Sequence, residues 1–323
     1  MITEKTVFIL GAGASCPYGF PSGAQLREDI RFKFQDVYSR YAYRIWKREI
    51  EDVERPIVKF IDKFYNSTTK SIDLFMAGNP TLVETGKYII AFEMLGAEQK
   101  SCFREESQIR AQDWYSYLFN RMRDTIKNKT EITKFTENNV SFITFNYDRS
   151  LEYFFYESLR NSFTEVPEQE IITILKQLKI IHVYGAIAPL DWQDGENGVK
   201  YRTQITESVL QKTSRNLRTI YEETQNPELL RACKLIEEAT RIFFLGFGYA
   251  EENINILSLP RMIPLHSKVY GTGFGLEQGE IKKIYNGIWN GLKEHPETRG
   301  KRDYYEVVIE NKHCLELLRN YLQ

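Results

Sequence analysis

A glycine-rich turn follows the first apolar run of the chain. The run Thr6–Leu10 is typical of a buried strand, and the residues directly after it, 11–15, have the sequence GAGAS. Glycine permits positive φ values and lets the main chain approach a ligand closely. Bare N–H groups at such a turn, ahead of a helix, suit a pyrophosphate. The turn therefore predicts a nucleotide bound at an α/β sheet. A glycine-rich βα turn without a ligand would have the same sequence pattern.

The turn departs from the fingerprint of hydride-transfer dinucleotide domains. That fingerprint is G-x-G-x-x-G or A, with a helix following at once and an acidic residue at the end of the second strand. Here Cys16 stands at the third glycine position, and Pro17 and Pro21 delay the helix, whose expected N-cap is Ser22. The sequence therefore indicates a nucleotide site of another kind.

Polar side chains follow two later strand-like runs. Asn146 and Asp148 come directly after Val140–Phe145. His182 lies near the end of Ile180–Tyr184. Ligands of open α/β sheets bind beyond the carboxyl ends of the strands, so we expect these side chains to face one crevice. Each of these residues also has a purely structural interpretation. Asn146 and Asp148 could cap the following helix, and His182 could be a core histidine.

Small residues end two more strand-like runs. They are Gly246 and Gly248 after Ile242–Leu245, and Gly271 and Thr272 after Lys268–Tyr270. We expect the backbone at these glycines to come close to the same ligand. Ordinary turn glycines would give the same pattern.

Short β-branched or aromatic runs separated by helical patterns must position these residues. The expected strands are Thr6–Leu10, Val140–Phe145, Ile180–Tyr184, Ile242–Leu245, Lys268–Tyr270 and Tyr304–Ile309. Such alternation predicts an α/β fold, with a Rossmann-like, mostly parallel sheet of about six strands flanked by helices. Further helices are expected at Gly23–Phe34, Glu207–Thr224, Pro227–Ala239 and Asn311–Leu322.

A long segment between the first two strands carries helical periodicity and no convincing strand. Its expected helices are Val37–Ile50, Pro56–Tyr65, Ser71–Met76, Leu82–Leu95 and Trp114–Ile126. We therefore assign residues 1–30 and 140–323 to the sheet domain. Residues 31–139 are expected to form a helical module that is inserted into the sheet domain or caps it.

Composition narrows the class of protein. Lys and Arg number 43 against 44 Asp and Glu, so no electrostatic footprint for nucleic acid is expected. No apolar run approaches the roughly 20 residues of a membrane helix, and no signal peptide is visible. The four cysteines form no C-x-x-C pair, which argues against a zinc ribbon and favours reduced thiols in the cytoplasm.

Several short motifs together resemble the sirtuin-like family. They are GAGAS at Gly11–Ser15, TFNYD at Thr144–Asp148, HVYG at His182–Gly185 and FLGFGY at Phe244–Tyr249, in the order in which that family carries them. PSG at Pro21–Gly23 and SIDLF at Ser71–Phe75 resemble the bacterial sirtuin-like proteins of phage-defence systems. The resemblance extends from about Val7 to Gly273.

The chain also departs from the deacetylase sirtuins. It lacks their four-cysteine zinc site, and Pro21–Ala24 stands where they carry P-D-F-R. The resemblance therefore implies hydrolysis of NAD with water in place of an acyl-lysine, NAD being the substrate and no metal being required.

This resemblance suggests a role for each candidate residue. The backbone of Gly11, Ala12, Gly13 and Ala14 and the hydroxyl of Ser15 would hold the pyrophosphate. Gly246, Gly248 and Gly271 would lie along the adenosine half, with Thr272 on a ribose hydroxyl. Asn146 would hold a water at the anomeric carbon, His182 would take a proton from that water or from a ribose hydroxyl, and Asp148 would orient the site and offset positive charge.

An NAD-degrading activity needs control. The resemblance implies an effector of antiphage defence that is regulated by homo-oligomer assembly or by a partner such as a HerA-type ATPase. Two alternatives remain open at this stage. One is an NAD-dependent protein deacylase or ADP-ribosyltransferase, and the other is a non-catalytic sensor of NAD or ADP-ribose.

Overall fold

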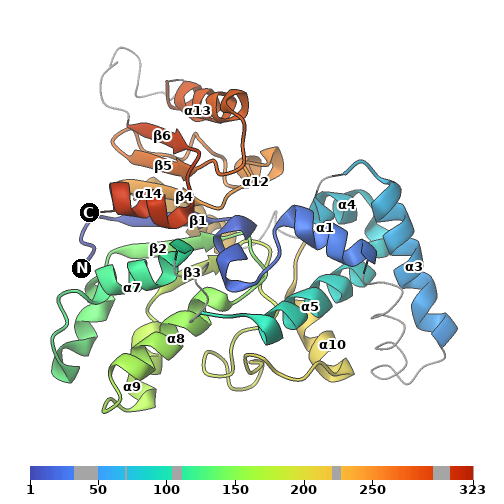
Figure 1. Ribbon diagram of the computed structural model, residues 1–323, viewed down its shortest axis with the longest axis horizontal. Coiled ribbons are helices and arrows are strands. Elements are labelled where there is room, and N and C mark those ends of the chain that lie inside the picture. Colours follow the sequence, from blue (N-terminus) through green and yellow to red (C-terminus); the bar gives the residue numbers. More distant parts are fainter. Residues whose placement is uncertain (33–49, 70, 104–110, 220–226, 294–305, 323) are drawn as a thin grey trace.

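A six-stranded parallel sheet organises the chain (Figure 1). The computed structural model describes residues 1–32, 50–69, 71–103, 111–219, 227–293 and 306–322. The strands are β1 (Thr6–Leu10), β2 (Val140–Thr144), β3 (Lys179–His182), β4 (Arg241–Leu245), β5 (Lys268–Thr272) and β6 (Val307–Glu310). Helices flank the sheet, and the predicted Rossmann-like α/β fold is confirmed. The first two residues of the expected run Tyr304–Ile309 lie outside the described residues.

The strand order is β3-β2-β1-β4-β5-β6. The chain therefore moves outward from β1 in one direction through β2 and β3, and in the other direction through β4, β5 and β6. Between β1 and β4 the order reverses, and such a switch point is where open α/β sheets bind ligands, beyond the carboxyl ends of the strands.

Burial on both faces explains why the central strands are apolar along their length. Every residue of β1, β2 and β4 is buried. The ring of Phe8 lies between those of Phe142 and Phe243, with centroid separations of 5.3 and 5.4 Å. The register pairs Leu10 with Thr144 and with Leu245. The three central strands therefore end at the same level, and the segments that follow them begin side by side.

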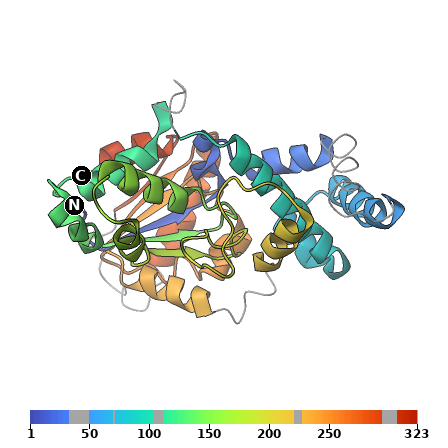
Figure 2. The ribbon, with the colours of Figure 1, turned by 90° about the horizontal axis from the view of Figure 1, so that it is seen from below.

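Helices cover both faces of the sheet. The connection from β2 to β3 contains α8 (Ser150–Ser162) and α9 (Glu168–Leu175), and the connection from β3 to β4 contains α11 (Pro227–Glu237). These crossovers run in opposite directions across the sheet, so right-handed connections place α8 and α11 on opposite faces (Figure 2).

The remaining sheet helices complete these layers. They are α7 (Trp114–Arg123), α12 (Glu251–Ile256), α13 (Gln278–Lys293) and α14 (Cys314–Tyr321). The helix α7 contacts both α8 and α14. None of the helices in the described ranges is both long and apolar enough to cross a membrane.

A group of helices lies beyond the carboxyl ends of the strands, at the right of Figure 1. These helices, which we call the helical lobe, are α1 (Gly23–Phe32), α3 (Ile50–Asn66), α4 (Ile72–Gly78), α5 (Val83–Lys100) and α10 (Glu207–Asn216). The helix α5 contacts each of the others. Phe60, Phe64 and Phe75 are buried inside the lobe, with their ring centroids 5.0 to 5.9 Å apart. The expected helix Val37–Ile50 lies outside the described residues except for its last residue, which begins α3.

The lobe differs in extent from the expected module of residues 31–139. The end of that range, α7 and the 3-10 segment η5 (Lys129–Glu137), packs with the sheet helices. Trp114 is fully buried and its indole N–H donates to Ala14 O at 2.7 Å, while Asn138 Oδ1 accepts from Ile2 N at 2.8 Å. The helix α1, most of which precedes the expected range, and the helix α10, which follows it, pack in the lobe.

A buried ion pair joins the lobe to the sheet. Arg149, directly before α8, donates from Nε to Glu98 Oε1 at 2.7 Å and from a terminal nitrogen to Glu98 Oε2 at 3.0 Å. The side chains are 1% and 0% exposed. The other terminal nitrogen of Arg149 donates to the carbonyls of Pro189 and Val199 at 3.0 and 2.5 Å. This guanidinium therefore connects α5, α8 and the loop after β3.

Candidate active site at the carboxyl ends of β1 and β2

The glycine turn after β1 packs directly on the turn after β4. Gly11 N donates to Leu245 O, and Gly13 N donates to Gly246 O, both at 3.0 Å. A Cβ added to Gly246 would stand 2.0 Å from Ala14 N, and Gly246 has a φ of 55°. One added to Gly11 would stand 2.6 Å from Gly246 O. Close approach of the two turns therefore explains these glycines before any ligand is considered.

This packing also engages most of the amides that were predicted to hold a pyrophosphate. Besides Gly11 and Gly13, Ala14 N donates to Gly11 O at 2.9 Å and Ser15 N donates to Ala12 O at 3.2 Å. The amide of Ala12 takes no part in these bonds. A phosphate at this turn would therefore meet the Ala12 amide and the half-buried backbone of Ala12 and Gly13, and its binding there stays a prediction.

Asn146 is held at almost every polar group it has. Its N–H donates to Thr144 Oγ1 at 3.0 Å, and its carbonyl accepts from the Nδ1 of His182 at 2.9 Å. Its Nδ2 donates to Gly11 O at 3.0 Å and to Ser15 Oγ at 3.3 Å. Because a carbonyl oxygen only accepts, Nδ2 must be the atom that faces Gly11. Oδ1 therefore points the other way.

The side-chain oxygen Oδ1 is the polar atom of Asn146 that the described part of the protein leaves without a hydrogen bond. It is buried and has no hydrogen-bond partner in the described part of the chain. A buried acceptor left unpaired costs about 1–3 kcal/mol, and native proteins leave few of them. Asn146 as a residue is half-buried. The arrangement therefore presents one fixed acceptor, beside the glycine turn, that a water or a hydroxyl group would satisfy.

Asp148 lies on the same side as Asn146 and shares Ser15 with it. The carboxyl oxygen Oδ1 of Asp148 accepts from Ser150 N at 3.0 Å and from the Ser150 hydroxyl. Burial raises the pKa of Asp148, and hydrogen bonds from Ser150 and Ser15 oppose that rise. Asp148 therefore bonds the first residue of α8, although Arg149 occupies the N-cap position, and Asn146 makes no bond to the helix start in the described ranges.

The imidazole of His182 is close to the main chain of Asn146, and both of its nitrogens are engaged. Nδ1 faces Asn146 O at 2.9 Å, and Nε2 faces Glu152 Oε1 at 2.7 Å. The side chains of His182 and Glu152 are 12% and 5% exposed. The structure thus brings His182 to the site as a bonded neighbour of Asn146 without leaving a ring nitrogen for a substrate.

Glu152 and Asp73 are two further acidic residues near the site that were not among the predicted site residues. Glu152 lies in the first turn of α8, and its Oε1 contacts His182 at the end of β3. Asp73 of α4 accepts a hydrogen bond from the hydroxyl of Tyr147, the residue after Asn146. Burial raises the pKa of Asp73 to about 6, with Glu252 of α12 adding to the rise. The helical lobe thus reaches the strand ends through the SIDLF segment.

The residues after β4 and β5 mainly support this arrangement. Thr272 Oγ1 accepts from Gly246 N at 2.8 Å and donates to Phe244 O at 3.3 Å. A Cβ on Gly271 would stand 2.1 Å from the hydroxyl of Tyr249. Thr272 and Gly271 therefore hold the β4 turn in place, whereas Gly248 is exposed with open space around it. Contacts of all three with adenosine stay predictions.

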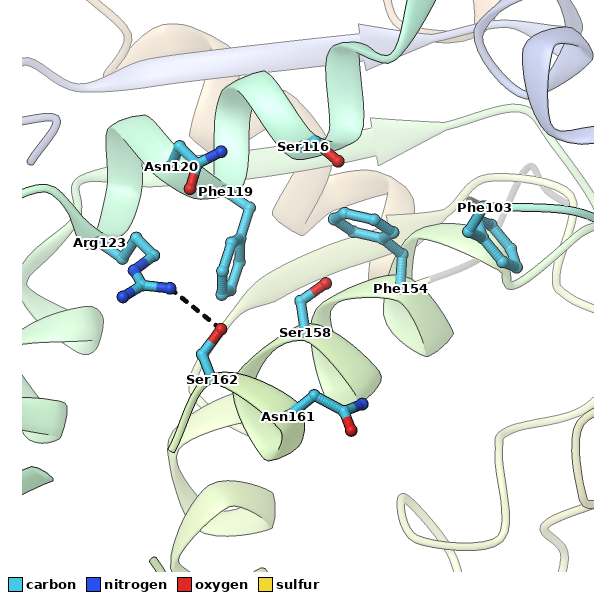
Figure 3. A pocket seen from close by; sticks show the side chains of 9 residues that line it. All are labelled: Phe103, Ser116, Phe119, Asn120, Arg123, Phe154, Ser158, Asn161 and Ser162. Carbon is cyan, nitrogen blue, oxygen red and sulfur yellow. Dashed lines mark hydrogen bonds between the residues drawn. The ribbon is translucent and has the colours of Figure 1, made fainter. Parts of the chain in front are cut away.

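A separate groove of about 210 Å³ lies between α7 and α8 (Figure 3). Phe119 and Phe154 form its buried floor, and Arg123 donates to Ser162 Oγ at 3.0 Å along one side. None of the residues just described around Asn146 lines this groove. Among the residues that the structure describes, no group of three or more His, Cys, Asp or Glu side chains could hold a metal ion.

No protein-family model matches the chain, and no curated protein matches it either. The geometry at the strand ends and the motifs of the sequence are therefore the basis for a functional proposal.

Proposed function

We propose that this protein is an NAD⁺ hydrolase that cleaves the nicotinamide–ribose bond to give nicotinamide and ADP-ribose. The observation that carries the proposal is the fixed, unpaired Oδ1 of Asn146 beside the glycine turn. The place of this group supports a dinucleotide as the substrate, since Asn146 bonds Gly11 of the turn after β1, and that turn borders the switch point between β1 and β4.

The chemistry suits such a site. Nicotinamide leaves a cationic ribosyl carbon as a neutral molecule, taking the electron pair of the bond, so the leaving group needs little acid catalysis. The barrier is the oxocarbenium-like charge on the ribose and the delivery of water to one face. Asn146 Oδ1 would hold that water, whose oxygen bonds to the anomeric carbon as its proton passes to solvent. Asp148, in its ionised form, would offset the developing positive charge.

Product analysis tests the proposal. Purified protein is incubated with NAD⁺, and nicotinamide and ADP-ribose are quantified by liquid chromatography and mass spectrometry. We expect Asn146→Ala to lose at least about 100-fold in rate, while Asn161→Ala, on the exposed part of α8, keeps the wild-type rate. Equal rates for wild type and Asn146→Ala would reject the proposal. Formation of O-acyl-ADP-ribose from acyl-lysine peptides would point to a deacylase instead.

The resemblance to phage-defence proteins supports a cytoplasmic effector of antiphage defence as the biological setting. Control would come from homo-oligomer assembly or from a partner such as a HerA-type ATPase. Light scattering with and without such a partner, coupled to the NAD assay, tests this. A monomer with full activity on its own would contradict it.

One observation favours a second candidate, a non-catalytic sensor of NAD or ADP-ribose. Both nitrogens of His182 are engaged, so the ring offers no base to a bound nucleotide, as in a site that binds without turning over. Calorimetric binding of NAD with no product after long incubation would support the sensor.

A further inference from the structure

Two successive hydrogen bonds connect Glu152 of α8 to Asn146 through His182. Glu152 Oε1 contacts His182 Nε2 at 2.7 Å, and His182 Nδ1 contacts the main-chain oxygen of Asn146 at 2.9 Å. The second carboxyl oxygen of Glu152 is buried without a partner among the described residues. The Glu152 carboxyl therefore makes its only hydrogen bond in the described structure to the imidazole.

The partners of His182 determine its protonation. Asn146 O can only accept, so Nδ1 must carry a hydrogen. Burial alone lowers the pKa of His182, but the charge of Glu152 and the bonds to Glu152 and Asn146 outweigh burial, and the nearby charge of Asp148 adds to them, so the pKa lies above its ordinary value. A ring protonated at both nitrogens satisfies both neighbours, and it has no lone pair with which to accept a proton.

We infer that Glu152 and His182 are positioning residues that hold the main chain of Asn146, and that His182 is not the base of the reaction. The imidazole fixes the Asn146 carbonyl, the glycine turn fixes its Nδ2, and Oδ1 is thereby aimed at one point. A misplacement of about 1 Å at such a group can cost on the order of 100-fold in rate. The kinetic part of this inference rests on the proposed function, whereas its protonation part does not.

Nitrogen-15 NMR of histidine-labelled protein tests the protonation. The chain has 4 histidines, so the His182 signals can be assigned by single Gln replacements of the other histidines, even if no His182 variant folds. We expect both ring nitrogens of His182 to be protonated at pH 7.5 in wild type, and one to lose its proton at that pH in Glu152→Gln. A neutral His182 ring in wild type at pH 7.5 would overturn the inference.

Kinetics tests the positioning role. His182→Asn keeps an amide N–H near the place of Nδ1, so it can still donate to Asn146 O, whereas His182→Ala cannot. We expect kcat for NAD hydrolysis to be at least about tenfold higher in His182→Asn than in His182→Ala. Similarly, Glu152→Gln should exceed Glu152→Ala in kcat, with little change in KM. Equal kcat for His182→Asn and His182→Ala would contradict the positioning role and would indicate that His182 acts as the base.

Glu157→Ala on the outer side of α8 is the matched control, and we expect it to keep the wild-type kcat. If wild type itself releases no nicotinamide with any partner tried, the proposed function fails, and the NMR experiment still decides the protonation of His182. The two failures are therefore distinguishable.

Discussion

At the scale of single residues, the candidate site is organised around one asparagine. The N–H, the carbonyl and the amide nitrogen of Asn146 are all bonded to the protein, and only Oδ1 is not. A side chain held this way has little rotational freedom left to lose when a reactant binds. This is the kind of preorganisation that lowers the barrier to attack by water.

Asn146→Asp tests whether the orientation of this side chain matters. The new carboxylate would place an acceptor against Gly11 O, where the amide now donates. We expect the variant to lose about 1–3 kcal/mol of unfolding free energy from the unpaired acceptors and at least about 100-fold in NAD hydrolysis. Urea denaturation and nicotinamide release measure the two effects. Wild-type stability would show that Nδ2 does not face Gly11.

Some of this site could be predicted from residue order alone. Parallel strands end at one edge, so Asn146, Asp148 and His182 were expected to lie together. His182 bonds the carbonyl of Asn146, and Asn146 and Asp148 both bond Ser15. The pairing of the turn amides could not be predicted, because it depends on contact between residues 11–13 and Gly246, far apart in sequence. Engagement of both nitrogens of His182 was missed because Glu152 belongs to a helix, not to a strand end.

At the scale of elements, the contact between the turns after β1 and β4 predicts that alanine at Gly246 and at Gly248 will affect stability differently. Gly246→Ala would force a Cβ to within 2.0 Å of Ala14 N at a φ of 55°. We expect a loss of at least about 2–3 kcal/mol in unfolding free energy. Gly248→Ala, two residues on, meets open space and should change stability by no more than about 0.5 kcal/mol. Thermal and urea unfolding compare them, and similar losses would contradict the packing argument.

The contact between α4 and the segment after β2 should respond to pH. The pKa of Asp73 is raised from 3.8 to about 6, chiefly by burial. The folded protein therefore holds this proton more tightly than the unfolded chain, so the carboxyl contributes stability below about pH 4 and loses it as pH rises through 6.

Asp73→Asn keeps an acceptor for Tyr147 and removes this titration. Tyr147, Ser71 and Glu252 are the neighbours that influence the carboxyl, and the variant retains them all. We expect the stability of the variant relative to wild type to rise between pH 4 and pH 7 by up to roughly 3 kcal/mol. Urea denaturation at both pH values measures this, and a difference independent of pH would count against it.

The elements that the sequence predicted best are those buried on both faces. The first strand has the expected bounds, and β2 and β4 differ from theirs by one residue at one end, because a fully buried strand is apolar throughout. The extent of the helical lobe was harder to predict from the sequence. The amphipathic helices α1 and α10 bury one side against α5, and periodicity shows that a helix has an apolar side without showing which neighbour covers it.

At the scale of the whole molecule, the pair Glu98–Arg149 connects the lobe with the sheet. Arg149→Met would leave the buried Glu98 carboxyl without its cation, with the Arg202 N–H as a remaining donor, and would remove the hydrogen bonds from Arg149 to the carbonyls of Pro189 and Val199. We expect a loss of about 3–5 kcal/mol in unfolding free energy. The exposed ion pair of Arg160 offers a control, since Arg160→Met should cost no more than about 1 kcal/mol. Equal costs in urea denaturation would refute this role.

The central position of β1 has a consequence for how the protein is made. Thr6 pairs with Val140 on one side and with Arg241 on the other, so the first strand leaves the ribosome long before either neighbour exists. Until then its run TVFIL is an unpaired apolar segment of the kind that chaperones retain and that aggregates when synthesis stalls. We expect chains truncated before residue 140 to be insoluble or chaperone-bound, whatever the stability of the finished fold.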